Sequence, residues 1–205
     1  MHPNQQFHWE DRDAMRALVA DIGFGTLFAA TPDGPRTAHL PVVIDGDRLT
    51  FHIARGNALT RHLDGATALF SLLGPDAYVS PDWYNLGPDQ VPTWNYVAVE
   101  LEGRVSRLDE AGLLDQIDAL SARHEPRIMD KQPWTRAKAD PAYIAKLLGG
   151  IQGFALDIMA WRGTIKLGQN KPVEARLAVA DALESEGRRS VAHLMRALVM
   201  EEDRE

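Results

Sequence analysis

The sequence predicts an α+β domain built on a barrel-like antiparallel sheet with helices around it. Six β-rich runs are separated by turn signals such as TPDGP and DGD, as in an antiparallel meander. Helical periodicity appears before, between and after these runs, without a regular alternation of strand and helix. This arrangement favours a barrel-like sheet over a doubly wound parallel one.

The expected elements follow in chain order. Residues 10–21 carry apolar Met15, Leu18 and Val19 at three- and four-residue steps, the pattern of an amphipathic helix. The runs expected to form strands are 22–30, 36–45, 48–54, 66–74, 94–108 and 153–167. The segments expected to form helices are 109–124, 141–148 and 173–183. Between two of these helices, residues 125–140 are expected to form a long loop because they combine two prolines with scattered charges.

Length and composition indicate one folded unit. A chain of 205 residues with 45% hydrophobic residues, and without internal repeats, is expected to form a single domain over 1–205. The helical patterns after about residue 172 are expected to form a C-terminal extension. Their second half, SVAHLMRALVM, is mostly apolar, so packing explains it better than the base-reading helix of a helix-turn-helix.

Charge and cysteine content exclude several classes of function. A net charge of −7 does not support DNA as a partner, although a local basic face stays open. The absence of cysteine agrees with the cytoplasm, and no apolar window approaches the roughly 20 residues that span a bilayer. His39 and His52 lie on neighbouring predicted strands, but no metal-ligand spacing is present, so we expect structural histidines and no metal. Motifs for Rossmann, P-loop and GxSxG chemistry are also absent.

The segment LTFHIARGNALTRHL, residues 49–63, gathers cationic side chains where a strand gives way to a helix. If Asn57 caps that helix, the free backbone N–H groups of the helix's first turn and the Arg55 guanidinium together suit a phosphate. The alternative is a helix cap with two solvated arginines, Arg55 and Arg61, and on this segment alone that alternative is favoured.

Two further segments are candidates for ligand contacts. Residues 74–100 combine Tyr and Trp with prolines and glycines, which suits either a flat-sided ligand pocket or a packed loop or dimer contact. Residues 163–172, GTIKLGQNKP, place hydrogen-bonding side chains at a strand end before Pro172 starts a helix.

Six ordered motifs closely resemble the PaiB-type family of FMN-binding negative transcriptional regulators. They are FGTL at 24–27, AHLP at 38–41, HIARGN at 52–57, YVSPDWY at 78–84, VPTWNYVAVELEG at 91–103 and KLGQNK at 166–171. The sequence departs from the family pattern with Gly168 in place of the usual serine and Gly56 in place of the usual alanine. Glycine at 168 removes a hydroxyl that could contact flavin, while glycine at 56 could help the backbone approach a phosphate.

This resemblance implies a six-stranded antiparallel split β-barrel with peripheral helices, forming a homodimer that holds FMN at the subunit interface. By the resemblance, Arg55 and Asn57 meet the FMN phosphate, and His52 and Ala54 line the approach. The residues implied to flank the ribityl chain and ring are Arg36, Thr37, His39 and Leu40. Those implied to approach the isoalloxazine are Trp94, Asn95, Lys166, Gln169 and Asn170.

The fold leaves three functions open. The first, which the family name implies, is an FMN-bound dimer that lowers transcription, directly or indirectly. The second is an FMN-dependent oxidoreductase linked to a reduced nicotinamide, for which no nicotinamide site is recognisable. The third is a flavin-free or haem-linked protein on the same fold, which the intact HIARGN segment disfavours.

Overall fold

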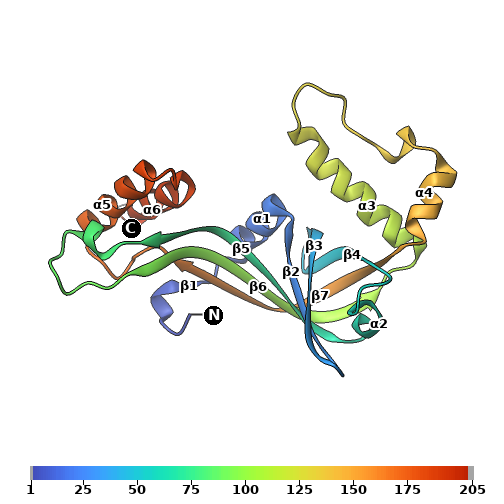
Figure 1. The fold of residues 1–205 in the computed structure, drawn as a ribbon, viewed down its shortest axis with the longest axis horizontal. Helices are drawn as coiled ribbons and strands as arrows, with labels where there is room; N and C mark the ends of the chain where they lie inside the picture. Colours follow the sequence, from blue (N-terminus) through green and yellow to red (C-terminus); the bar gives the residue numbers. More distant parts are fainter. Residues whose placement is uncertain (1, 203–205) are drawn as a thin grey trace. The chain divides into compact units, whose positions relative to one another are not determined.

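The computed structural model describes residues 2–202 and has an α+β fold with one antiparallel sheet of seven strands. The strands are β1 (His8–Trp9), β2 (Phe24–Thr31), β3 (Gly34–Asp45), β4 (Arg48–Ala54), β5 (Thr67–Val79), β6 (Thr93–Arg107) and β7 (Ile151–Lys166). The α-helices are α1 (Arg12–Ile22), α2 (Thr60–Leu63), α3 (Glu110–His124), α4 (Pro141–Leu148), α5 (Val173–Ser185) and α6 (Arg189–Glu202) (Figure 1).

The strand order is β1-β7-β4-β3-β2-β5-β6, with an additional pairing between β7 and β6. The predicted number of six strands is therefore wrong by one. The missed strand, β1, has only two residues, and it forms because His8 and Trp9 pair with Thr164 and Gly163 on β7. So short a strand has no alternation of its own for sequence reasoning to detect.

The chain divides into two compact units, each described here by itself. Unit 2 comprises residues 12–72 and 100–161, and unit 1 comprises residues 1–11, 73–99 and 162–205. The long strands β5, β6 and β7 contribute residues to both units. The prediction of a single domain over 1–205 stays a prediction.

The core of unit 2 follows from alternation along its strands. On β4, Leu49, Phe51 and Ile53 are buried, while the residues between them point to the opposite face. Phe51 stacks on Phe154 of β7 with ring centroids 5.8 Å apart, and the two residues are register partners. Burial of each such aromatic side chain contributes about 2–3 kcal/mol to folding.

Close backbone packing also joins β6 to β7 in unit 2. A Cβ at position 103 would collide with the carbonyl of Asp157, so only Gly103 fits there.

Helices α3 and α4 of unit 2 begin within one residue of their predicted starts. Asp109 caps α3 by accepting the Gly112 N–H at 2.8 Å, and Asp140 caps α4 by accepting two N–H groups of its first turn. Helices α1 and α3 contact β3, and α3 also contacts β4. In contrast, no residue of α4 is buried.

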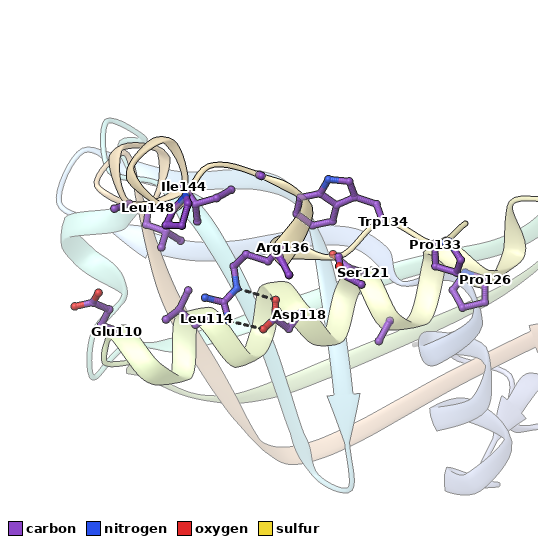
Figure 2. A pocket seen from close by; sticks show the side chains of 16 residues that line it. Glu110, Leu114, Asp118, Ser121, Pro126, Pro133, Trp134, Arg136, Ile144 and Leu148 are labelled. Atoms are coloured by element: carbon purple, nitrogen blue, oxygen red, sulfur yellow. Dashed lines mark hydrogen bonds and ion pairs between the residues drawn. The ribbon is translucent and has the colours of Figure 1, made fainter. Parts of the chain in front are cut away.

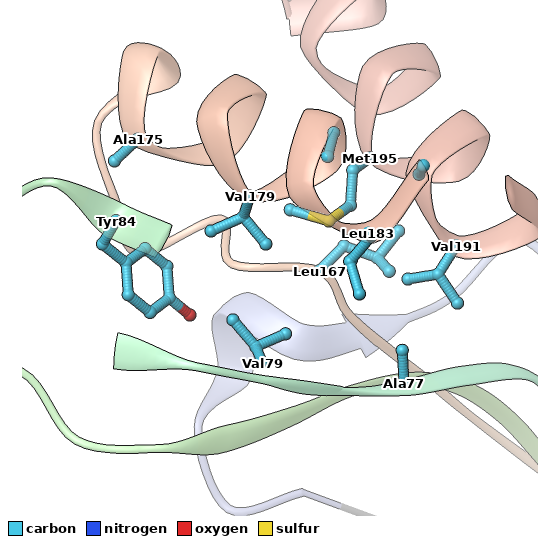
Figure 3. Close-up of a cluster of buried hydrophobic side chains, with 11 residues drawn as sticks. Ala77, Val79, Tyr84, Leu167, Ala175, Val179, Leu183, Val191 and Met195 are labelled. Carbon is cyan, nitrogen blue, oxygen red and sulfur yellow. The ribbon is translucent and has the colours of Figure 1, made fainter. Parts of the chain in front are cut away.

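The core of unit 1 forms between β5, the end of β7 and the C-terminal helices (Figure 3). Val179 and Leu183 of α5 and Met195 of α6 are fully or almost fully buried against Val79 and Leu167. The apolar pattern of α6 therefore serves packing, as predicted, and is not a free base-reading helix.

The predicted end of the fourth strand at residue 74 is wrong. The structure extends β5 to Val79, so Tyr78 lies on a strand and not in a turn-rich loop, whereas Trp94 lies on β6 close to the start of its predicted strand. Pro75 and Gly74 suggested a break, but strand pairing overrides these local signals.

Candidate functional site

The thirteen predicted ligand residues divide between the two units. Eight belong to unit 2, namely Arg36, Thr37, His39, Leu40, His52, Ala54, Arg55 and Asn57. Five belong to unit 1, namely Trp94, Asn95, Lys166, Gln169 and Asn170.

Arg55 lies directly after β4 and is held by neutral partners. Its Nε donates to the Gly149 carbonyl at 3.0 Å, and its Nη1 donates to Oε1 of Gln152 at 3.0 Å. Gln152 is buried and is itself anchored, since its Nε2 donates to the Leu108 carbonyl at 3.2 Å. Among the described residues no carboxylate pairs with Arg55. The guanidinium is thus positioned and exposed, with its charge uncompensated, as an anion site requires.

The turn after Arg55 differs from the predicted cap. The N-cap position of α2 is Leu59, not Asn57, and α2 has only four residues. Asn57 instead accepts the Leu59 N–H at 2.9 Å, and Thr60 donates its hydroxyl to the Ala54 carbonyl at 2.7 Å. Asn57 therefore shapes the turn by an Asx-type contact. Because a single helical turn has a weak dipole, Arg55 is the main attraction for an anion here.

The second arginine of this segment is already paired. Arg61 lies 3.5 Å from the carboxylate of Asp33 and donates to His62. Both ends of that ion pair are exposed. Arg61 is accordingly the weaker candidate for an added anion.

The predicted residues on β3 alternate between two faces. Arg36, Thr37 and His39 are exposed, whereas Leu40 is 2% exposed and belongs to the core. The Nδ1 atom of His39 lies 2.9 Å from the hydroxyl of Thr26, its register partner on β2. The Leu40 side chain is therefore unavailable to a ligand, and Leu40 could contact one only through its backbone.

His52 faces α3 and is half-buried. Its Nδ1 donates to Oε1 of Gln116 at 2.8 Å. Gln116 is buried, and its Nε2 has no hydrogen-bond partner among the described residues. Neither Gln116 nor Gln152 was predicted from the sequence. Each is a polar residue on the buried face of its helix or strand, and only the fold shows which face is buried.

In unit 1, Trp94 and Tyr78 form an exposed aromatic pair. Their ring centroids are 6.0 Å apart in an edge-to-face arrangement, and the indole N–H of Trp94 donates to Asp76 at 2.9 Å. Each of the two residues is 49% exposed. This surface can contact a flat apolar group.

Asn95, the neighbour of Trp94, is fully buried. Its Nδ2 donates to the sulfur of Met195 on α6 at 3.4 Å, while its Oδ1 has no partner among the described residues. A buried amide oxygen without a partner costs about 1–3 kcal/mol.

The KLGQNK segment is ordered by its own hydrogen bonds. Gln169 accepts the Leu167 N–H and donates to the Ile165 carbonyl, both at 2.8 Å, so its amide stabilises the turn. Gly168 has φ +83°, a left-handed conformation that glycine adopts without strain and that serine adopts only with strain. Asn170 is exposed.

Two lysines of this segment have neutral partners in unit 1. Lys166 donates to the hydroxyl of Thr93 at 2.7 Å, and Lys171 donates to Gln90 at 2.7 Å while lying 5.2 Å from the ring of Tyr84. Burial raises the pKa of the Tyr84 hydroxyl, which therefore stays neutral near pH 7.

Each unit by itself offers groups that suit one part of a flavin mononucleotide. In unit 2, Arg55 presents a positioned, uncompensated guanidinium that suits a phosphate. In unit 1, Trp94 and Tyr78 present exposed rings that suit a flat ring system. Within residues 2–202, no group of three or more His, Asp or Glu side chains is arranged to hold a metal ion. No helix of the described chain is both long and apolar enough to cross a bilayer.

Two solved structures that share the fold have names that refer to a flavin. The FAD and heme binding protein from Mycobacterium smegmatis superposes with a TM-score of 0.60 at 22% identity, covering 78% of this chain and 74% of that one. The flavocytochrome Anf3 from Azotobacter vinelandii superposes with a TM-score of 0.58 at 17% identity, covering 82% of this chain and 73% of that one. At these identities the likeness establishes the fold alone.

The sequence places the chain in a family. The family model described as "Putative FMN-binding domain" matches residues 1–160, so the chain belongs to this family of FMN-binding domains. The "Protease synthase and sporulation protein PAI 2" of Bacillus subtilis (strain 168) is 29% identical over 174 residues, which are 82% of each chain. The predicted PaiB-type resemblance is confirmed. The prediction of FMN as cofactor is also confirmed, since the family match supports FMN or a related flavin.

Proposed function

We propose that this protein is a PaiB-type FMN-binding regulator that lowers transcription as a homodimer. The observation that carries the proposal is Arg55, an exposed guanidinium that the structure fixes through Gly149 and Gln152 without a carboxylate partner. Its place in HIARGN, within the region matched by the FMN-binding family, supports its assignment to the FMN phosphate.

The proposed fold is the split β-barrel. The pairing of β7 with both β4 and β6 supports it, because each of the six longer strands then pairs with two others of the six. Flavoprotein neighbours with TM-scores of 0.58 to 0.60 give further support.

In this proposal the chain's residues have separate tasks. Arg55 binds the phosphate, and Asn57 and Thr60 hold the turn that presents it. Arg36, Thr37, His39, Leu40, His52 and Ala54 flank the bound cofactor, Leu40 through its backbone. Trp94, Lys166 and Asn170 act at the ring. The buried Asn95 and the turn-forming Gln169 contribute by holding these neighbours in place. When bound, FMN supplies a redox-active ring, and the protein residues position it.

A regulatory role is supported by kinship with a relative whose name refers to protease synthase and sporulation. The net charge of −7 and the burial of one face of α6 argue against a broad DNA-binding surface, so indirect repression fits better than direct binding. We place the protein in the cytoplasm, which the absence of cysteine from its 205 residues supports.

Titration of purified protein with FMN, followed by flavin fluorescence and by light scattering for mass, tests this proposal. We expect saturable binding at one FMN per chain and the mass of a dimer. A colourless protein that FMN cannot titrate would refute the cofactor assignment, and a strictly monomeric mass with FMN bound would refute the dimer. Mobility shifts on promoter and scrambled DNA at two salt concentrations separate direct from indirect repression.

A further inference from the structure

Unit 2 contains a cleft of about 820 Å³ that includes none of the predicted flavin residues. It lies between α3 and residues 126–148, with Leu114, Ile144, Leu148 and the indole of Trp134 among its lining (Figure 2). Small-molecule sites typically have volumes of about 300–1,000 Å³ and mostly apolar walls. The cleft therefore has the size and lining of such a site.

The charges along the cleft select the kind of ligand. Arg136 is paired with Asp118 through two hydrogen bonds of 3.0 and 2.7 Å (Figure 2), and the bond to Asp118 raises the pKa of the guanidinium. Glu110, also in the lining, is exposed in the first turn of α3 and forms no ion pair with any described residue. Two carboxylates and one guanidinium give the lining a net charge of −1. An apolar molecule with one positive charge is the complementary ligand.

The cleft is connected to Arg55 through the end of α4. Leu148 lines the cleft, and the next residue, Gly149, provides the carbonyl that accepts from Arg55 Nε. The carbonyl of Gly150 accepts the backbone N–H of Arg55 at 2.9 Å. Any displacement of the α4 end thus moves the acceptors that hold the guanidinium.

Helix α4 is also the weakly held wall of the cleft. None of its residues is buried, and Tyr143 is 58% exposed. Few apolar contacts make a segment easy to open locally. A ligand in the cleft would add apolar contacts to Ile144 and Leu148 and so would order the helix.

We propose that the α3–α4 cleft is an effector site for a small apolar monocation, and that its occupancy strengthens FMN binding by fixing Arg55 through Gly149. The effector role rests on the proposed flavin function, whereas ligand binding in the cleft does not.

The first experiment measures binding by isothermal titration with two isosteric probes, tetraphenylphosphonium and tetraphenylborate. We expect saturable binding of the cation and at least about tenfold weaker binding of the anion. Glu110→Gln should weaken cation binding about threefold to tenfold. Equal affinities for the two ions would overturn the proposal.

A matched pair of variants locates the site. Ile144→Lys places a positive charge in the cleft, while Tyr143→Lys places the same charge on the adjacent, exposed residue that does not line it. We expect the first variant to lose cation binding by about tenfold or more and the second to stay within about twofold of the parent. Equal losses in both would show that the cation binds elsewhere and would overturn the proposal.

The second experiment measures FMN affinity with and without saturating tetraphenylphosphonium. We expect the cation to lower the Kd of FMN about fivefold, and FMN to lower the Kd of the cation by the same factor. Arg55→Ala should keep cation binding and lose this coupling. If the cation leaves the FMN affinity of the parent unchanged, the effector role is overturned. If FMN does not bind at all, the proposed function is refuted. In that case the first experiment still decides whether the cleft binds the cation.

Discussion

Replacing Arg55 with alanine should weaken FMN binding far more than replacing Arg61. Arg55 is fixed by two hydrogen bonds to neutral acceptors, so its charge is available to a phosphate. A hydrogen bond to a charged group contributes about 1.5–3 kcal/mol, and 1.4 kcal/mol changes a Kd tenfold, so the loss should be about 10- to 150-fold. Arg61 already pairs with Asp33, and its removal should change the Kd by no more than about twofold.

Flavin fluorescence titration provides the assay, and riboflavin provides the control because it lacks the phosphate. Arg55→Ala should weaken FMN binding while leaving riboflavin binding nearly unchanged. A thermal melt should show a loss of about 1 kcal/mol, since the variant also loses its bonds to Gly149 and Gln152. Equal FMN affinities for the parent and both variants would refute the phosphate assignment.

The remaining predictions concern stability and pH. Asn95→Leu should raise the thermal midpoint by about 2–4 °C, because it removes a buried oxygen without a partner; a lower midpoint would show that its bond to sulfur matters more. Gly168→Ala should destabilise the fold by about 1 kcal/mol in a urea titration because of its positive φ, whereas Gly56→Ala, with open space at its Cβ, should be neutral; equal effects would contradict this reading. The hydrogen bond from Lys131 holds the pKa of the Glu125 carboxyl below its ordinary value of 4.5. The ionised carboxylate therefore stabilises the fold above pH 4.5, and this stabilisation is lost as the pH falls through the lowered pKa. Limited proteolysis should therefore cut near Glu125 faster in acid, and Glu125→Gln should abolish that acid dependence; a dependence that persists would rule out this carboxylate as its cause.

Much of the fold was predictable because local signals agree with tertiary packing. The bounds of β4 and α4 match the predicted segments, since alternation defines the first and Asp140 with Pro141 defines the start of the second. The two errors in the strands have one cause. Long-range pairing created β1 and carried β5 across Pro75, against weak or contrary local preferences.

The sequence by itself determined which family the chain belongs to, where most elements lie and which segment carries the candidate phosphate residue, because motif order, periodicity and residue chemistry are properties of the linear chain. Only the tertiary structure decided how each arginine is held. The sequence already favoured Arg55 over Arg61 for the phosphate, and the fold supplies a physical reason by giving Arg55 the neutral partners Gly149 and Gln152 and giving Arg61 the carboxylate of Asp33. The cleft beside α4 was likewise invisible in the sequence, because its walls, α3 and residues 126–148, form a cavity only through the way they pack.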